Sequence, residues 1–225
     1  MARPTLVVFD VNETLSDLQQ LRGRFEEVGA PSELLEVWFA STLRDGLALT
    51  AADAYAEFRT VAVGVLCGQL DRIETLRLDP SEAAEHIVSG FGKLDVHADV
   101  VEGVRKFAAA GVRMATLTNG PAEFAEQLLD RAGLTDLIER HLSVDTVKRW
   151  KPAREAYLYA AREFGVSPAR CALAAVHPWD VDGAKRAGFL GAWLNRKGGP
   201  YPDFFEQPDA TDATLAGLAE TLLAA

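Results

Sequence analysis

The chain has 225 residues, 48% of them hydrophobic, and a formal net charge of −10 at pH 7. This composition is typical of a water-soluble globular protein, and the length favours one core domain with an inserted module. The sequence contains no run of 18 apolar residues, so we expect no membrane span. It also lacks the concentrated basic face that phosphate backbones require, so we expect no nucleic-acid partner.

The two cysteines indicate a reducing compartment. Cys67 and Cys171 both lie in apolar stretches, where they are typical of small core residues and not of a disulfide framework. The first residues lead directly into a strand-like run, without the pattern of a signal peptide. We therefore expect a cytoplasmic protein.

The first predicted element is a strand over 5–9, and the stretch that follows it is almost entirely helical in pattern. Pro31 and Pro80 mark helix starts within this stretch. The predicted helices cover 18–28, 32–43, 51–66, 71–76 and 81–91. An all-helical block after the first strand of an α/β domain indicates a cap, which we place at residues 16–92.

From residue 93 onward, strands and helices alternate. The predicted strands cover 113–117, 142–144, 171–176 and 191–194. The predicted helices lie around 100–107 and over 121–132, 153–164, 181–187 and 211–223. This alternation predicts an α/β fold, with a Rossmann-like parallel sheet, helices on both of its faces, and a core formed by residues 1–15 and 93–225.

Polar residues follow four of the predicted strands, and the carboxyl ends of parallel strands are where ligands bind in such sheets. Each set also has a local explanation, because Asp, Thr and Asn often form turns or cap helices, and a lysine in a loop is often solvated. The agreement in position among the four strand ends favours one convergent site. The residues are Asp10, Asn12 and Thr14; Thr118 and Asn119; Lys151; and His177, Trp179 and Asp180.

Four stretches resemble the ordered motifs of the haloacid dehalogenase superfamily, and among its members the type II 2-haloacid dehalogenases. The stretches are "VVFDVNETL", "TLTNG", "WKPAREAY" and "HPWDVDGAKRAGF". The resemblance implies a metal-independent conversion of a short 2-haloalkanoic acid to a 2-hydroxy acid through an ester on Asp10. It implies no cofactor, a small carboxylic acid as partner, and allows a homodimer.

The resemblance also assigns roles to individual residues. Asp10 is the expected nucleophile, with Thr14 hydrogen-bonded to it and Lys151 keeping it ionised. Asp180 would orient or deprotonate the hydrolytic water, with His177 as an assistant. The expected substrate-binding residues are Val11, Asn12, Thr118, Asn119, Phe39, Arg44, Tyr157 and Trp179.

Asn12 and Val176 argue against a magnesium-dependent phosphatase. Phosphatases of the superfamily have a proton-donating Asp two residues after the nucleophile, and the amide of Asn12 cannot donate that proton. Their fourth motif supplies an acid where this chain has Val176, so one expected metal ligand is missing. The alternatives left open are a phosphatase or another small-molecule hydrolase of the superfamily, and a non-catalytic relative that binds a small acid.

The sequence departs from the dehalogenase pattern at two further places. The resemblance predicts a halide-binding Arg at the position of Phe39, whereas Arg44 lies five residues later and is the alternative candidate. Phe39 could equally belong to the core of the cap together with Trp38. The resemblance also predicts Asn at the position of His177.

Overall fold

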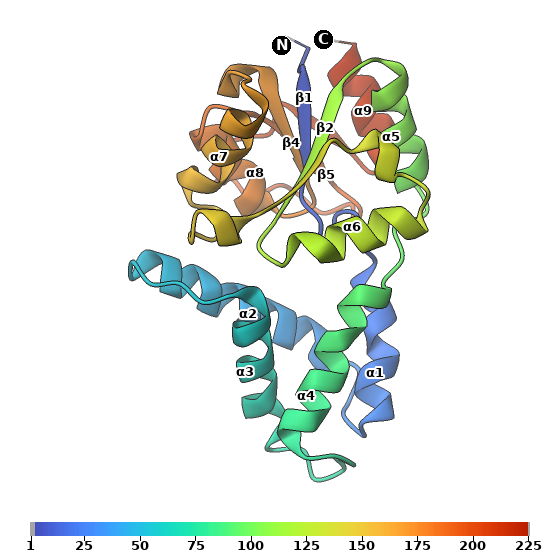
Figure 1. The fold of residues 1–225 in the computed structure, drawn as a ribbon, viewed down its shortest axis with the longest axis vertical. Coiled ribbons are helices and arrows are strands. Elements are labelled where there is room, and N and C mark those ends of the chain that lie inside the picture. Colours follow the sequence, from blue (N-terminus) through green and yellow to red (C-terminus); the bar gives the residue numbers. More distant parts are fainter. Residues whose placement is uncertain (1–2, 225) are drawn as a thin grey trace.

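The computed structural model describes residues 3–224, which form an α/β core and a helical cap (Figure 1). The core contains one six-stranded sheet in the order β3-β2-β1-β4-β5-β6, and every strand pair is parallel. The strands are β1 Leu6–Phe9, β2 Arg113–Thr118, β3 Arg140–Ser143, β4 Cys171–Ala175, β5 Leu190–Leu194 and β6 Ala210–Asp212. The predicted parallel sheet is thus confirmed.

The central strand β1 consists of four completely buried apolar residues, as expected for a strand covered on both faces. Its last residue, Phe9, pairs with Thr116 of β2 and with Ala174 of β4. This register brings the carboxyl ends of β1, β2 and β4 to the same edge of the sheet, which is the edge that faces the cap.

Helices cover both faces of the sheet (Figure 1). Helices α5 and α9 pack together on one face, and α7 and α8 lie on the other. The core helices are α5 Val100–Ala109, α6 Ala122–Arg131, α7 Arg154–Phe164, α8 Pro178–Arg186 and α9 Leu215–Leu223. Gly165 ends α7 in the left-handed conformation, with φ of 62°, as glycine at a helix end favours.

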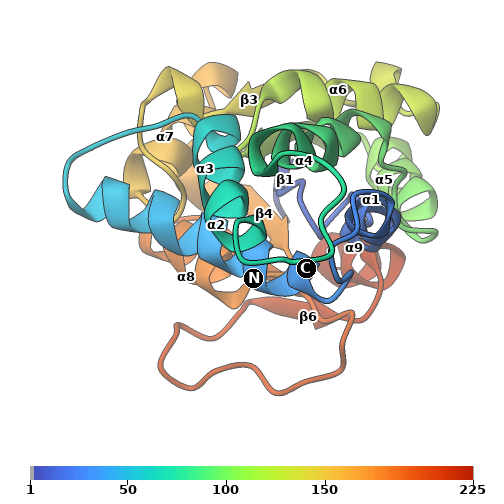
Figure 2. The same ribbon diagram turned by 90° about the horizontal axis from the view of Figure 1, so that it is seen from below.

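The sixth strand was not predicted. Residues 211–223 were expected to form one helix, but Ala210–Asp212 adds an edge strand beside β5. Helix α9 begins only at Leu215, because Thr214 adopts an extended conformation and its hydroxyl accepts a hydrogen bond from the Gly217 N–H at 3.0 Å. The connection from β5 to β6 is an extended loop at the edge of the molecule (Figure 2).

The cap contains four α-helices, and two of its predicted boundaries were wrong. Helix α2 continues past residue 43 to Ala51, and α3 begins at Phe58 instead of residue 51, because Asp53 adopts a left-handed conformation that ends the helical path. Residues 71–76 form isolated turns and not a helix. The helices are α1 Arg22–Glu27, α2 Leu34–Ala51, α3 Phe58–Leu70 and α4 Pro80–Val88.

Two antiparallel passages connect the cap with the core. Ser16 pairs with Val96, the Asp17 N–H donates to the Asp95 carbonyl, and the His97 N–H donates to the Leu15 carbonyl. This pairing supports the predicted placement of the cap at 16–92, between core segments 1–15 and 93–225. The division into these segments stays a prediction. Residues 1, 2 and 225 lie outside the described residues. Within 3–224, no helix is both long and apolar enough to span a bilayer.

Candidate active site

Asp10 follows β1 at the edge of the sheet that faces the cap, and it is 4% exposed. Its backbone N–H donates to the Ala174 carbonyl, which continues the sheet pairing by one residue. The Thr14 hydroxyl donates to Oδ2 of Asp10 at 2.6 Å and accepts a hydrogen bond from the Val176 N–H at 3.1 Å. Thr14 therefore ties the loop after β1 to the end of β4 and orients the carboxylate.

Lys151 places its ammonium between two carboxylates. Nζ lies 2.8 Å from Oδ1 of Asp10 and 2.6 Å from Oδ2 of Asp180. Lys151 and Asp180 are both completely buried. Because an unpaired charge in this environment would be very costly, the three groups form one interdependent cluster.

Tyr157 on α7 completes the cluster from the side of Asp180. Its hydroxyl donates to Oδ1 of Asp180 at 2.6 Å, so both carboxylate oxygens of Asp180 already hold a protein donor. Tyr157 is completely buried. It therefore fixes Asp180 and has no exposed surface for a substrate in this conformation.

The two carboxyl groups have opposite pKa shifts. Burial by itself raises the pKa of Asp10, but the Lys151 ammonium, then His177, and hydrogen bonds from Lys151 and Thr14 lower it to below its ordinary value of 3.8. Burial, together with the charge of Asp10, raises the pKa of Asp180 despite the opposing effect of Lys151. Burial would lower the pKa of Lys151, but its two carboxylate neighbours raise it. Lys151 thus favours the ionised form of Asp10.

Asn119 positions Lys151 through the backbone. Its side-chain oxygen accepts from the Lys151 N–H at 2.8 Å, and its amide nitrogen lies 3.4 Å from the Lys151 carbonyl oxygen. The Thr118 hydroxyl accepts from the Gly120 N–H at 2.9 Å and is also buried. The turn after β2 therefore uses both side chains for local structure, and Asn119 contributes to the site as a support for Lys151.

The cap binds the loop that carries Lys151. The Trp150 N–H donates to the Thr50 hydroxyl at 3.1 Å, and the indole N–H donates to the Ala56 carbonyl at 3.0 Å. The indole also stacks on Phe58, with ring centroids 5.8 Å apart. Gly46 allows this contact, because a Cβ there would lie 2.3 Å from the Trp150 ring. The position of Lys151 therefore depends on α2 and α3.

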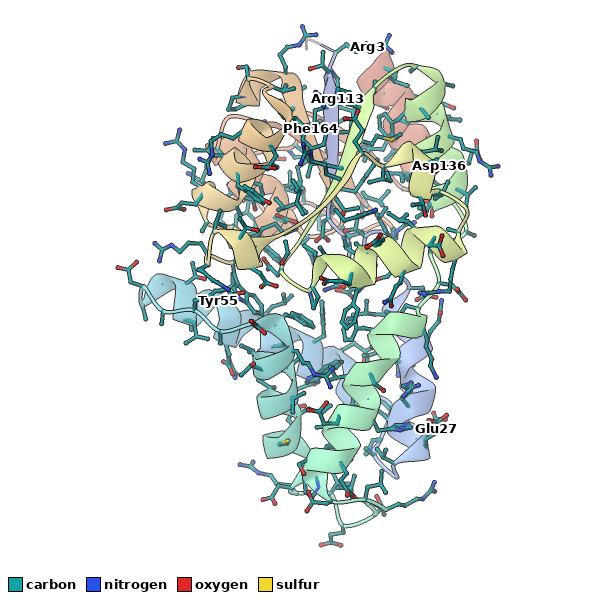
Figure 3. The ribbon with its side chains drawn as sticks, viewed as in Figure 1. Arg3, Glu27, Tyr55, Arg113, Asp136 and Phe164 are labelled. Carbon is teal, nitrogen blue, oxygen red and sulfur yellow. The ribbon has the colours of Figure 1, made fainter. Side chains whose placement is uncertain are left out.

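Tyr55 provides a second contact between cap and core. It lies in the connection between α2 and α3, close to the core (Figure 3), and its hydroxyl donates to the Asp145 carboxylate. The ammonium of Lys148 lies 4.6 Å from the centre of the Tyr55 ring. These contacts attach the cap to the segment between β3 and Lys151.

His177 lies at the start of α8, between two aromatic rings. Its ring stacks on Trp179, with centroids 5.1 Å apart and an interplanar angle of 21°. The ring centroid of Phe39 in α2 lies 6.4 Å from that of His177. Nε2 of His177 lies 3.5 Å from Oε2 of Glu13, in the loop after β1. The structure thus brings His177, Trp179 and Phe39 together at the junction of cap and core.

Two cavities open at this junction and share part of their lining. A cavity of about 300 Å³ lies between the core and α2, and a second cavity of about 380 Å³ lies beside the loop after β5. The shared lining includes Glu13, His177 and Lys197. Phe39 and Trp179 line only the first cavity, which gives it an aromatic wall.

Arg44 is not brought to this site. Its side chain is 69% exposed, and Nε lies 2.7 Å from the adjacent Asp45 carboxylate. Five residues along a helix correspond to a rotation of about 140°, so Arg44 lies on a different face of α2 from Phe39.

Val11 and Asn12 lie in the loop after β1, where Val11 is buried and Asn12 is half-buried.

Within residues 3–224, no group of three or more His, Cys, Asp or Glu residues could hold a metal ion. Val176, where the phosphatase pattern has an acid, donates its backbone N–H to Thr14 and offers only an aliphatic side chain. The residues present therefore do not fit the magnesium site of the phosphatases.

A family model of haloacid dehalogenase-like hydrolases matches residues 4–188. The chain belongs to this family. The (S)-2-haloacid dehalogenase 4A of Burkholderia cepacia is 30% identical over 196 residues, which cover 86% of this chain and 84% of that protein. The (S)-2-haloacid dehalogenase of Pseudomonas sp. (strain YL) is 26% identical over 219 residues, 95% of this chain and 92% of that protein.

The solved structures support the same family. The L-2-haloacid dehalogenase from Xanthobacter autotrophicus, with chloropropionic acid covalently bound, aligns with a TM-score of 0.85 at 25% identity. The alignment covers 96% of this chain and 97% of that one. The predicted family and the α/β fold with a cap are therefore confirmed.

Sequence reasoning missed three residues around the site of this haloacid dehalogenase-like hydrolase. Trp150 precedes Lys151 in a motif that was recognised, but its contacts with the cap could not be read from the sequence. Glu13 adopts a left-handed conformation, with φ of 62°, which is uncommon for a residue with a side chain. Lys197 follows β5 in a segment that composition marks only as a loop. Its place after a strand was the one available signal.

Proposed function

We propose that this hydrolase removes halide from a short 2-haloalkanoic acid through an ester on Asp10, without a metal ion. The observation that carries the proposal is the Asp10 carboxylate, held ionised by Lys151 and oriented by Thr14. A lowered pKa and a fixed orientation are what a carboxylate nucleophile needs. The named relatives that catalyse 2-haloacid dehalogenation support the same chemistry.

In the first step, an oxygen of Asp10 attacks the substrate carbon that carries the halogen, and the carbon–halogen bond breaks with release of halide. Halide is a good leaving group and requires no proton, so Asn12 is compatible with this step. Thr118 and the backbone N–H groups near Val11, Asn12 and Asn119 are proposed to hold the substrate carboxylate. Phe39 and Trp179 are proposed to contact the apolar part of the substrate.

In the second step, water attacks the carbonyl carbon of the Asp10 ester. The carbonyl–oxygen bond to the alkyl group breaks, which releases a 2-hydroxy acid and regenerates the carboxylate. Lys151 stays beside the reacting carboxyl group and stabilises negative charge that develops on it. Asp180, fixed by Tyr157, is proposed to keep this ammonium in place.

Chloride release from 2-chloropropionate in the presence of EDTA tests the proposal. We expect multiple turnovers with the natural protein and none with Asp10→Asn, whose amide is a poor nucleophile. Magnesium-dependent hydrolysis of p-nitrophenyl phosphate without chloride release would contradict the proposal and favour a phosphatase. Tight binding of 2-chloropropionate with no turnover of either compound would favour a non-catalytic relative.

We further propose a cytoplasmic location and a homodimer. The free thiols of Cys67 and Cys171 support the first, because such thiols persist in reducing compartments. The apolar helices of the cap would permit the second. Light scattering of the purified protein measures the oligomeric state, and a monomer at micromolar concentration would contradict the homodimer.

A further inference from the structure

His177 and Glu13 form an imidazole–carboxylate pair at the wall of both junction cavities. The contact between Nε2 and Oε2 is 3.5 Å, and the two side chains are 14% and 29% exposed. Stacking on Trp179 limits rotation of the imidazole ring. A carboxylate beside one ring nitrogen favours the proton on that nitrogen and leaves the other nitrogen as an acceptor.

Asp180, by contrast, has no access to water from either cavity. Its side chain is completely enclosed, and Lys151 and Tyr157 donate to its two oxygens at 2.6 Å each. Because Asp180 has no exposed surface, a water molecule could reach its oxygens only if the surrounding groups moved. His177 lines both cavities. It directly follows Val176, whose N–H donates to the Thr14 hydroxyl, and this hydroxyl donates to Asp10. The imidazole is therefore both accessible and close to the nucleophile.

We propose that His177, oriented by Glu13, is the general base that activates the water for hydrolysis of the Asp10 ester. This inference rests on the proposed function and assigns the base for its second step. The ring nitrogen not paired with Glu13 takes a proton from water as the water oxygen bonds to the ester carbon. When the tetrahedral intermediate breaks its bond to the alkyl oxygen, the imidazolium returns that proton to the departing alkoxide.

The charged and titratable groups around His177 come from several elements. Glu13 and Asp17, in the segment after β1, and Glu36 of α2 line the cavities beside His177. Asp10, at the start of that segment, is influenced by the charge of His177. His97 lies on the returning passage from the cap. Arg196 and Lys197 follow β5, and Arg196 is paired with Asp99 at 2.6 Å. Because several titratable groups surround His177, the pH dependence of the overall reaction would not report on His177 alone. The rate of ester hydrolysis is therefore measured separately from the rate of ester formation.

His177→Asn separates the two steps. We expect a burst of about one chloride per site from 2-chloropropionate, because ester formation needs no base, followed by hydrolysis slowed about 10²-fold or more. Mass spectrometry of the quenched protein should find the 1-carboxyethyl ester on Asp10. The matched control is His86→Asn in α4, which changes a histidine in the cap far from Asp10 and should leave both rates unchanged.

Three results together distinguish a base from a structural residue. In the natural protein, hydrolysis of the ester should slow as the pH falls, while ester formation should not, and His177→Asn should lose this acid limb. Imidazole in the buffer should accelerate hydrolysis in His177→Ala. Glu13→Gln should retain the acid limb and hydrolyse the ester more slowly than the natural protein, but faster than His177→Asn.

The failure of this inference differs from the failure of the proposed function. Hydrolysis in His177→Asn at the natural rate, or an acid limb that persists in that variant, would overturn the role of His177 and leave the ester mechanism intact. The absence of both chloride release and an Asp10 adduct in the natural protein would overturn the proposed function itself.

Discussion

The core and the cap contribute different chemistry to the junction between them. The core brings Asp10, Lys151, Asp180 and Tyr157 into a buried cluster in which every charge has a partner. The cap contributes Phe39, an aromatic side chain, and leaves its nearby Arg44 in solvent. In this hydrolase the core therefore supplies the charged groups of the site. The cap supplies an apolar wall and holds Trp150 in place.

Replacing Lys151 with Met tests the core side of this comparison and should have the largest effect. Two carboxyl groups would lose their cation, so we expect the free energy of unfolding to fall by about 3–5 kcal/mol. We expect the rate of chloride release to fall about 10²- to 10³-fold. Urea denaturation and a chloride assay measure the two effects. Lys93→Met in an exposed position is the control.

The pH dependence of the Lys151 effect follows from Asp10. The folded pKa of Asp10 lies below its ordinary value of 3.8, so the ion pair contributes fully above that value and is lost as the pH falls through the lower folded pKa. The stability difference between the natural protein and Lys151→Met should therefore be larger at pH 6 than at pH 3. Equal differences would show that the ion pair does not stabilise the cluster.

The site residues of the core could be predicted from the sequence because their grouping follows from the order and direction of the strands. Parallel strands place their carboxyl ends at one edge, so Asp10, Asn119, Lys151 and Asp180 could be grouped before any coordinates were known. The contribution of Asn119 was less predictable, because its side chain holds the Lys151 backbone. A hydrogen bond between two distant loops produces no periodic pattern in the sequence.

The cap could be predicted only as a helical block. Helical periodicity does not reveal that Asp53 ends α2 or that residues 71–76 form turns, since these outcomes depend on packing. Periodicity also does not decide which face of α2 meets the core. Phe39 and Arg44 were therefore both candidates, and only the packing of α2 distinguished them.

A smaller effect is expected from Thr14→Val. The substitution removes one hydrogen bond to a charged carboxylate and one acceptor for the Val176 N–H, so chloride release should fall about 10- to 100-fold. The matched control is Thr42→Val, because Thr42 is also buried and its hydroxyl has no hydrogen-bond partner within residues 3–224. Similar losses of activity in both variants would show that the Thr14 hydroxyl is not specifically required.

Phe39→Arg tests the cap side. A guanidinium in the 300 Å³ cavity would assist departing halide, so we expect chloride release from 2-chloropropionate to rise about fivefold. The preference for 2-bromopropionate over 2-chloropropionate should narrow at the same time. Val37→Arg on the exposed face of α2 is the control. An unchanged bromide preference would show that halide does not leave towards Phe39.

The smallest effect is expected from Arg44→Ala. Because the guanidinium is in solvent and pairs with its neighbour Asp45, kcat/KM for 2-chloropropionate should stay within about twofold. A loss of tenfold or more would mean that α2 rotates to bring Arg44 into the site, and the cap would then supply a charge after all.

The central claim is that Asp10 forms an ester with the substrate, and a single turnover in ¹⁸O-labelled water tests it most directly. With enzyme in excess over 2-chloropropionate, water attacks the carbonyl carbon of the ester, so we predict label in the Asp10 carboxylate and unlabelled 2-hydroxypropionate. Label in the 2-hydroxypropionate and none in the peptide that contains Asp10 would show that water attacks the substrate directly, and would contradict the account.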